Sequence, residues 1–131
     1  LDIIMNYKVL VVDDSQTTRM SIKNFLGGGY TVEEAENGQI ALDILSEDNS
    51  FDLIILDINM PELDGMGFIH LQAKNDRVNK ILTILCTTEA SVIMKDKAKA
   101  TGVVKAWIVK PITSKVLLHA VDRVLESSKQ S

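Results

Sequence analysis

Five short apolar runs are spread along the chain, and each is followed by a segment whose apolar residues have a different spacing. The runs are long enough for β-strands and too short for buried helices. The third contains Leu53-Ile54-Ile55-Leu56 without a polar residue, which is typical of a strand buried on both faces. The predicted strands are residues 8–12, 30–35, 51–56, 81–86 and 104–109.

Between these runs the apolar side chains follow helical spacing. The last segment is the clearest, because its apolar positions fall on one helical face after a capping Thr113. These positions are Leu117, Ala120, Val121, Val124 and Leu125. Predicted helices cover residues 15–26, 38–45, 66–74 and 89–100, with a fifth after residue 113; Gly27 and Gly102 are expected to end the first and the fourth.

Strand and helix alternate five times, which is typical of a parallel sheet with helices on both faces. The right-handedness of crossover connections leaves few topologies for such a chain. The predicted fold class is therefore α/β, a doubly wound five-stranded parallel sheet of the (βα)5 type. No repeat or linker interrupts the pattern, so we expect a single domain. Residues 1–6 are expected to be a leader or remnant, and residues 127–131 a frayed polar tail.

The composition indicates which class of protein the chain belongs to and in which cellular compartment it is expected. Apolar residues make up 46% of the chain and charged residues 24%, which indicates a soluble globular domain. The sequence shows neither a signal peptide nor an apolar run long enough to cross a bilayer. Cys86 is the single cysteine, so no intrachain disulfide can form and a reducing cytoplasm is expected.

Charge is unevenly distributed along the chain. The net charge is −4, which argues against a nucleic-acid partner, but residues 91–131 carry eight Lys or Arg against three Asp or Glu. That segment therefore has a charge of +5 and the rest of the chain −9. Two interpretations remain open for the basic segment: a face that meets a partner, or ordinary solvated helix surfaces.

Polar residues with useful chemistry follow four of the five predicted strands. They are Asp13 and Asp14 after the first strand, Asp57 after the third, Thr87 after the fourth and Lys110 after the fifth. Turns often contain such residues for structural reasons alone. Because the carboxyl ends of parallel strands meet at one edge of a sheet, we expect these five side chains to converge there.

Three carboxylates at that edge would repel one another by roughly 3 kcal/mol for each pair about 5 Å apart. Lys110 supplies one compensating charge, and Mg²⁺, which prefers oxygen ligands, would supply two more. The alternative is a ligand-free ion cluster of Asp13, Asp14 and Lys110. A carboxylate beside Mg²⁺ and an ammonium group is well placed to attack phosphorus and form an aspartyl phosphate.

Four segments carry recognisable motifs: VLVVDDS at 9–15, LIILDINMPELDG at 53–65, TTEA at 87–90 and WIVKPI at 107–112. On these motifs the chain resembles response-regulator receiver domains, and among them the single-domain chemotaxis proteins of the CheY type. The likeness extends from about residue 8 to residue 125. It implies a flavodoxin-like sheet with strand order 2-1-3-4-5 and Mg²⁺-dependent phosphorylation by a histidine kinase.

The resemblance also implies which residues hold the metal ion. Asp57 is the implied phosphoacceptor and a metal ligand. Asp14 is implied to bind Mg²⁺ directly and Asp13 through water, while Asn59 lends its backbone carbonyl. Asn59, two residues after the acceptor, is also expected to modulate the reaction rate.

Further residues are implied to contact the phosphoryl group or to transmit its presence. Lys110 and Thr87 are the implied catalytic partners of the phosphoacceptor. Trp107 occupies the position of the switch aromatic, usually Tyr or Phe, and is expected to turn inward as Thr87 moves. Thr88 and Glu89 are expected to modulate the rate; Thr88 is larger than the residue usual at its position.

The implied output surface consists of the fourth helix, the fifth strand and the fifth helix, which coincide with the basic segment. The expected partners are a CheA-like histidine kinase as phosphodonor, an output protein such as a flagellar motor switch component and, optionally, a phosphatase. We expect a monomer that neither binds nucleic acid nor inserts into membranes. The resemblance implies a switch that catalyses its own phosphorylation and dephosphorylation, and we do not expect an enzyme with a separate substrate.

Alternative functions differ from this one in identifiable residues. A phosphatase of the haloacid dehalogenase type also uses an Asp nucleophile with Mg²⁺, but it needs a second acid where this chain has Asn59. A pseudo-receiver that is never phosphorylated would not need the full set of site residues. A further interpretation also stays open, in which the chain is a receiver domain excised from a larger regulator. His70 and His119 are expected to be surface residues, and Cys86 a buried apolar one.

Overall fold

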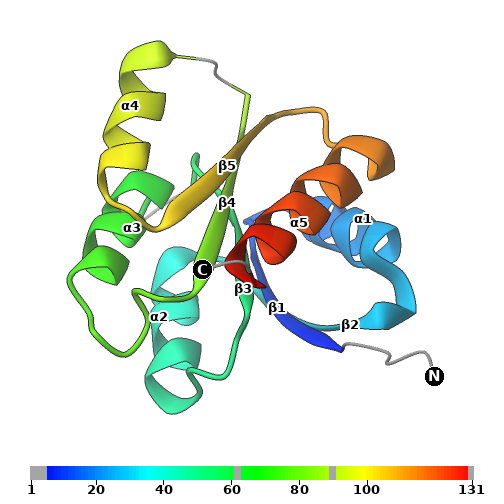
Figure 1. Cartoon of the computed structure of the whole chain (residues 1–131), viewed down its shortest axis with the longest axis horizontal. Helices are drawn as coiled ribbons and strands as arrows, with labels where there is room; N and C mark the ends of the chain where they lie inside the picture. Colours follow the sequence, from blue (N-terminus) through cyan, green and yellow to red (C-terminus); the bar gives the residue numbers. More distant parts are fainter. Residues whose placement is uncertain (1–5, 61–62, 89–90, 130–131) are drawn as a thin grey trace.

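The computed structural model describes residues 6–60, 63–88 and 91–129. Strands and helices alternate along the chain, with one short 3-10 helix after the first helix (Figure 1). The elements are β1 (Tyr7–Val12), α1 (Gln16–Leu26), η1 (Gly27–Gly29), β2 (Tyr30–Ala35), α2 (Gly38–Glu47), β3 (Leu53–Asp57), α3 (Gly65–Ala73), β4 (Leu82–Thr87), α4 (Val92–Ala100), β5 (Val104–Val109) and α5 (Ser114–Lys129).

The five strands form one parallel sheet in the order β2-β1-β3-β4-β5. This confirms the predicted fold class, a flavodoxin-like doubly wound α/β sheet. The central strand β3 is buried along its whole length, as its apolar sequence predicts. The carboxyl ends of β1, β3, β4 and β5 therefore reach the same edge of the sheet.

Two apolar layers cover the sheet, because alternate side chains of a strand point to opposite faces. Leu10 and Val12 of β1 belong to the layer under α2, α3 and α4. Val9 and Val11 belong to the layer under α1 and α5. Figure 1 shows this division, with α1 and α5 side by side on one face of the sheet. Both faces are thus closed, and the strand ends are held by a rigid core.

The fourth helix begins later than predicted. Its first residue is Val92, because Ser91 adopts an extended conformation and its hydroxyl accepts a hydrogen bond from the Met94 N–H at 3.3 Å. Serine is a preferred residue at this capping position. The prediction of a helix over 89–100 is therefore confirmed from Val92 onward, while residues 89 and 90 lie outside the described part of the chain.

The ends of the domain also differ from the prediction. The helix α5 continues to Lys129, so residues 127–129 are helical and the predicted start of the tail was wrong. There the Ser128 hydroxyl donates to the carbonyl of Leu125 at 2.7 Å. Asn6, inside the predicted leader, accepts a hydrogen bond from the Thr31 hydroxyl at 3.1 Å. Within the described residues no helix is both long and apolar enough to cross a lipid bilayer.

Candidate functional site

The loop after β1 brings two aspartates to the carboxyl edge of the sheet. Asp13 is buried, and its N–H donates to the carbonyl of Ala35 at the end of β2, at 3.1 Å. Asp13 Oδ1 in turn accepts the N–H of Ser15 at 2.8 Å. Asp14 is exposed. One carboxylate is thus fixed inside the loop, and its neighbour faces solvent.

Asp57 is the last residue of β3 and only 4% exposed. Its Oδ1 accepts the backbone N–H of Asn59 at 3.2 Å. The loop that follows is held by two backbone hydrogen bonds, from Ile58 N–H to the Cys86 carbonyl and from Gly65 N–H to the Ile58 carbonyl, each 3.0 Å long. The position of the Asp57 carboxylate is therefore defined by the neighbouring strand and by the start of α3.

The predicted convergence of charged side chains is confirmed. Carboxylate oxygens of Asp13, Asp14 and Asp57 lie within 4.8 Å of one another. Lys110, which follows β5, places its Nζ 3.1 Å from Asp13 Oδ2 and 3.3 Å from Asp57 Oδ1. Three negative charges and one positive charge therefore share a small space at the edge of the sheet.

The protonation equilibria of the site reflect this crowding. Burial, together with the charge of Asp13, raises the pKa of Asp57 above its usual range, although the Asn59 N–H and Lys110 act in the opposite direction. Burial lowers the pKa of Lys110, but the carboxylates of Asp13 and Asp57 outweigh that effect and the pKa is raised. Lys110 is therefore a stable cation at neutral pH, and ionised Asp57 lies in an unfavourable environment.

The donor set suits a hard divalent cation. Mg²⁺ takes oxygen ligands and commonly combines one or two carboxylates with water molecules. The predicted ligands Asp13, Asp14 and Asp57 lie together, and the exposure of Asp14 leaves the cluster accessible to a hydrated ion. One lysine does not balance three carboxylates, so the residues fit such an ion. The metal contact of the Asn59 carbonyl stays a prediction.

The ends of β4 and β5 complete the site. Thr87, the last residue of β4, is fully buried, and its carbonyl accepts the backbone N–H of Lys110 at 2.7 Å. The Lys110–Pro111 peptide bond is cis. Thr88 is exposed. Glu89, predicted to modulate the rate, lies outside the described residues.

The family of the chain follows from comparison with known proteins. A family model of the response regulator receiver domain matches residues 9–122. The chain belongs to this family. CheY1 of Helicobacter pylori is 38% identical over 124 residues, covering 90% of this chain and 96% of the relative. The chemotaxis protein CheY of Pseudomonas aeruginosa is 34% identical over 121 residues, covering 91% and 96%.

Solved structures show the same receiver fold. The chemotaxis response regulator CheY4 of Vibrio cholerae is similar to this receiver domain with a TM-score of 0.84 and 36% identity, covering 92% of this chain and 99% of that one. The receiver domain of a signal transduction histidine kinase from Syntrophus aciditrophicus has a TM-score of 0.83 and 31% identity, covering 95% and 94%. Similar receivers therefore occur both in chemotaxis proteins and in a kinase.

The predicted switch aromatic of this receiver domain lies on the edge strand β5. Trp107 is half-buried and packs against the apolar layer under α2, α3 and α4. Lys95 Nζ lies 5.9 Å from the centre of the indole ring, within the range of a cation–π contact. The indole Nε1 is buried and has no hydrogen-bond partner among the described residues. The inward turn of this ring stays a prediction.

Arg19 is a site residue that the sequence patterns did not reveal. Its Nη1 donates to the carbonyl of Asp13 at 2.5 Å, and its Nε donates to Glu34 Oε1 of β2 at 3.0 Å. Arg19 therefore ties the loop that bears the acidic pair to the neighbouring strand. A helical side chain points back toward the helix start. The sequence signal for this contact was therefore an arginine in the first turn of α1, four residues after the capping Ser15.

Gly65 is a second residue whose role the sequence did not reveal. A Cβ atom at this position would lie 2.6 Å from the Cα of Ile58 and 2.8 Å from the carbonyl oxygen of Asp57. Side-chain carbons do not approach backbone atoms that closely, so the start of α3 can touch the acceptor loop only through glycine. The sequence Asp64-Gly65 by itself indicates no more than a turn before a helix.

Proposed function

We propose that this receiver domain is a phosphorylation-controlled switch of a two-component system, and that Asp57 accepts a phosphoryl group from a phosphohistidine of a kinase. The observation that carries the proposal is the position of Lys110, 3.1 Å from Asp13 and 3.3 Å from Asp57, within a cluster of three carboxylates. A buried carboxylate beside a cation and two further acidic ligands has the charge arrangement that phosphoryl transfer requires.

The proposed reaction moves a phosphoryl group between two protein side chains. An oxygen of Asp57 forms a bond to phosphorus while the phosphorus–nitrogen bond of the donor breaks, and the electron pair of that bond stays on the imidazole nitrogen. Asp13, Asp14 and Asp57 would hold Mg²⁺, which would supply neutralising charge for the phosphoryl oxygens. Lys110 adds a further positive charge, and the Thr87 hydroxyl donates a hydrogen bond. The domain thereby catalyses its own phosphorylation, and hydrolysis occurs at the same site.

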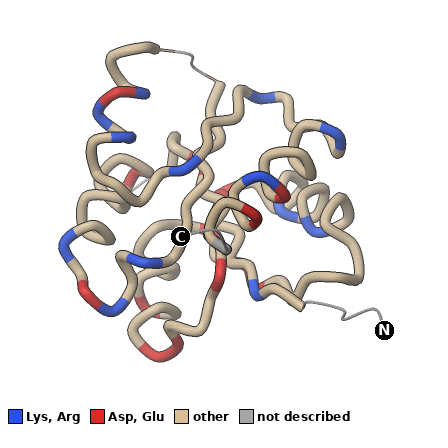
Figure 2. Tube along the Cα trace, in the orientation of Figure 1, with Lys and Arg blue, Asp and Glu red and all other residues tan. Residues whose placement is uncertain are grey.

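Residues around the acceptor are proposed to control the rate and to transmit the signal. Asn59 and Thr88 are both exposed beside the site, where they affect the access of water and of small phosphodonors. Movement of Thr87 and an inward turn of Trp107 are proposed to alter the surface formed by α4, β5 and α5. Figure 2 shows Lys and Arg along α4, in β5 and on α5, which suits a partner of opposite charge.

The relatives support a role in chemotaxis, because several of them are chemotaxis proteins by name. We therefore propose a CheA-like kinase as donor, a component of the flagellar motor switch as target and a phosphatase as an optional third partner. The domain would act in the cytoplasm as a monomer. Because a kinase receiver is also similar to this chain, the target needs a direct test.

The phosphorylation step can be tested by incubating the domain with phosphoramidate and Mg²⁺ and following the intact mass. Wild type and Asp76→Asn should each take up one phosphoryl group, since Asp76 lies in an exposed turn away from the site. Asp57→Asn should take up none, and EDTA should prevent uptake by all variants. Phosphate on Asp57→Asn, or equal uptake in EDTA, would show that the proposed acceptor or the metal requirement is wrong.

The switching step can be tested separately with beryllofluoride, a mimic of the phosphoryl group. Trp107 is the single tryptophan, so intrinsic fluorescence reports its environment without labelling. Beryllofluoride with Mg²⁺ should change the emission of wild type and leave that of Asp57→Asn unchanged. Mass measurement of the same sample shows whether beryllofluoride occupies the site at Asp57. If the site is occupied and the wild-type emission spectrum is unchanged, the proposed movement of Trp107 is refuted.

A further inference from the structure

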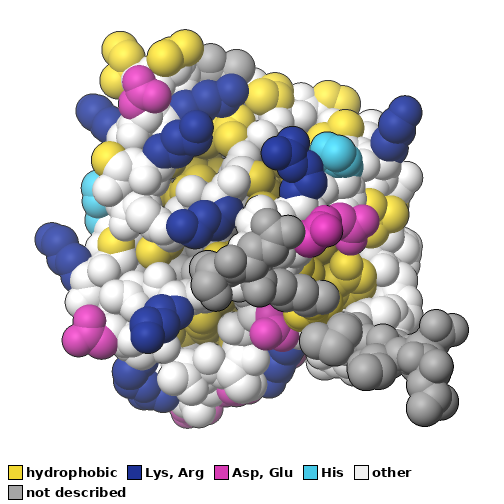
Figure 3. All heavy atoms as spheres, viewed as in Figure 1, with side chains coloured by type: hydrophobic (Ala, Val, Ile, Leu, Met, Phe, Trp, Pro, Cys, Tyr) yellow, Lys and Arg dark blue, Asp and Glu magenta, His cyan; other side chains and the backbone are white. Residues whose placement is uncertain are grey.

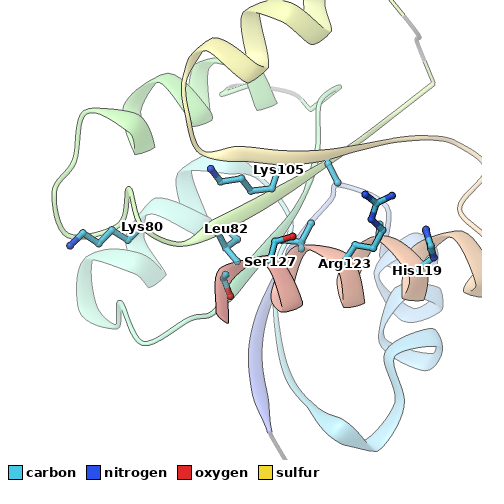
Figure 4. Close-up of a pocket in the computed structure, with 10 residues that line it drawn as sticks. Lys80, Leu82, Lys105, His119, Arg123 and Ser127 are labelled. Carbon is cyan, nitrogen blue, oxygen red and sulfur yellow. The ribbon is translucent and has the colours of Figure 1, made fainter. Parts of the chain in front are cut away.

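The three arginines of the chain differ in their surroundings. Arg123 is exposed on α5, beside a hollow of about 760 Å³, and forms no ion pair with the described residues (Figure 4). Figure 3 shows Lys and Arg side chains spread over the surface on this side of the molecule. The side chain of Arg19, in contrast, is only 12% exposed and contacts two partners. Taking a charged group out of water is costly, so its contacts need a reason.

Arg19 holds the backbone of the loop that carries the acidic pair. Its Nη1 donates to the Asp13 carbonyl at 2.5 Å, while its own backbone N–H donates to the Ser15 carbonyl at 3.0 Å. On the other side of the residue, the Asp13 N–H donates to the Ala35 carbonyl at 3.1 Å. Both backbone groups of Asp13 are therefore bonded, one to β2 and the other to a side chain from the first turn of α1.

Asp14 depends on this arrangement because it has no partner of its own. It is exposed, and its carboxylate forms no hydrogen bond or ion pair with any residue in the described part of the chain. The peptide group between Asp13 and Asp14 is planar, so the direction of the Asp13 carbonyl also fixes the N and Cα atoms of Asp14. By holding this carbonyl, Arg19 limits the positions that the Asp14 carboxylate can reach.

Glu34 in turn orients Arg19. Its Oε1 accepts the Nε–H of Arg19 at 3.0 Å. A guanidinium group is planar and its N–H groups have fixed directions, so contacts through Nε and Nη1 define the orientation of the whole group. Glu34 precedes Ala35 on β2, and the Ala35 carbonyl holds Asp13 directly. Two consecutive residues of β2 thus support the acidic loop, one through its backbone and one through Arg19.

We propose that Arg19 and Glu34 are a positioning pair that raises the Mg²⁺ affinity of the acidic cluster by ordering Asp14 before the ion binds. This role rests on the proposed function, because it assumes that Asp13, Asp14 and Asp57 hold the ion. A ligand that is already ordered does not lose conformational entropy when the ion binds. Replacing residues that orient metal ligands typically lowers metal affinity by about 10- to 100-fold.

The charge of Arg19 by itself would have the opposite effect. A guanidinium group near the cluster repels a divalent cation, so charge alone predicts tighter Mg²⁺ binding once Arg19 is replaced. Positioning predicts weaker binding. Because Glu34 compensates the charge of Arg19, replacing both residues leaves the net charge of the domain unchanged and isolates the positioning effect. The sign of the change in affinity therefore distinguishes the two explanations.

The test is calorimetric titration of the metal-free full chain with MgCl₂. Arg19→Met keeps an apolar stem without the guanidinium group and should weaken Mg²⁺ binding about tenfold. The charge-neutral variant Arg19→Met/Glu34→Met should be weakened to the same extent, since Glu34 acts through Arg19. The matched control is Arg77→Met, because Arg77 Nη1 also donates to a backbone carbonyl, that of Ser46 at 3.0 Å, outside the acidic cluster. Its affinity should stay within about twofold of the wild type.

Backbone dynamics provide a readout that does not depend on Mg²⁺. In the metal-free wild type, nitrogen-15 relaxation should give the Asp14 amide an order parameter near the value of about 0.85 that is typical of rigid backbone. Arg19→Met should lower this order parameter, and Arg77→Met should leave it unchanged. Arg19→Lys keeps the charge, but one ammonium group does not reproduce the planar two-point contact, so its order parameter and Mg²⁺ affinity should be intermediate. Circular dichroism and urea unfolding show whether each variant is folded, and Arg19→Lys carries the test if Arg19→Met is not.

Several results would overturn the inference. Arg19→Met that binds Mg²⁺ as tightly as the wild type, or more tightly, would exclude a positioning role. Wild-type affinity of the charge-neutral double variant would reduce the effect to charge, and equal weakening by Arg77→Met would reduce it to a general loss of stability. A mobile Asp14 amide in the metal-free wild type would show that Arg19 does not order this residue.

Phosphoramidate separates this inference from the proposed function. If wild-type Asp57 is phosphorylated and Arg19→Met keeps the wild-type Mg²⁺ affinity, the positioning role fails and the proposed function stands. If the variants follow the predicted pattern of Mg²⁺ affinity but Asp57 takes up no phosphoryl group, the proposed function fails and the positioning pair stands. Absence of Mg²⁺ binding by the wild type at millimolar concentration would overturn both the positioning role and the proposed metal requirement.

Discussion

Replacing Asp57 with asparagine should stabilise the domain in the absence of Mg²⁺, although it removes the proposed acceptor. The Asp57 carboxylate is 4% exposed and has two further carboxylates within 4.8 Å, with Lys110 as the compensating charge. Asparagine has nearly the same shape, and its side-chain oxygen can still accept the Asn59 N–H. The substitution therefore removes the charge of the group and little else.

The magnitude follows from the distances. At an effective dielectric constant near 20, the repulsion between Asp57 and Asp13 is about 3.5 kcal/mol, and exposed Asp14 adds about half as much because water screens it. The attraction of Lys110 at 3.3 Å is about 5 kcal/mol. The repulsion and the attraction nearly cancel. The sign of the stability change is therefore set by the free-energy cost of removing the side chain from water, which is larger for a carboxylate than for an amide. We expect a gain of about 1–2 kcal/mol, or roughly 5 °C in Tm.

Urea unfolding followed by circular dichroism measures the difference, and its pH dependence provides a second check. Because folding raises the pKa of Asp57, the ionised group lowers stability above its folded-state pKa. The cost disappears as the pH falls toward the ordinary aspartate pKa of about 3.9. The advantage of Asp57→Asn should therefore be full at neutral pH and vanish in acid. Millimolar Mg²⁺ should also reduce it, because the ion stabilises the wild type by binding to the folded state.

A variant that is less stable than the wild type at neutral pH without Mg²⁺ would refute this reasoning. It would mean that the attraction of Lys110 outweighs both the repulsion and the dehydration of Asp57. A stability gain that persists unchanged in acid would also contradict it, since protonated aspartate and asparagine are both neutral. Either result would remove the electrostatic argument for a divalent cation at this site.

Three other predictions concern residues around the site. Gly65→Ala should destabilise the domain by about 1–3 kcal/mol in urea unfolding and slow its phosphorylation, because the added Cβ collides with the backbone of Ile58. The matched control is Gly28→Ala, whose Cβ meets nothing within 4 Å, and this variant should not be destabilised. Burial raises the pKa of Cys86 to about 12. Its thiol should therefore react with Ellman's reagent at pH 8 only as fast as the domain unfolds. Fast reaction in the folded state would contradict this prediction. Thr88→Ala should be phosphorylated by acetyl phosphate faster than the wild type, and equal rates would exclude an effect of its bulk.

Much of the fold was predictable because its signals are local and repeated. The apolar run of β3 and the helical spacing in α5 each depend on neighbouring residues alone. The acidic cluster was predictable for a related reason, since a parallel sheet brings the ends of its strands to one edge whatever the details of packing. His70 and His119 are exposed and Cys86 is buried, as predicted from their residue types.

The unpredicted features depend on contacts between distant residues. The hydrogen bonds of Arg19 reach the Asp13 carbonyl and Glu34 of β2, and no sequence motif links Arg19 to either partner. Gly65 matters because α3 starts against the loop after β3, which no local pattern reveals. The start of α4 was predicted too early, because the residue that caps this helix is Ser91, two residues after the predicted start.

The indole nitrogen of Trp107 has a thermodynamic consequence. A buried N–H without a hydrogen-bond partner costs about 1–3 kcal/mol, and Trp107 has none among the described residues. Any arrangement that offers this nitrogen an acceptor therefore recovers that free energy, which corresponds to a change of roughly 5- to 150-fold in a conformational equilibrium. The contacts of this side chain within the described residues include apolar packing and the approach of Lys95. A carbonyl supplied by an altered strand, or by another molecule, would therefore favour whichever orientation of the ring lets this nitrogen reach it.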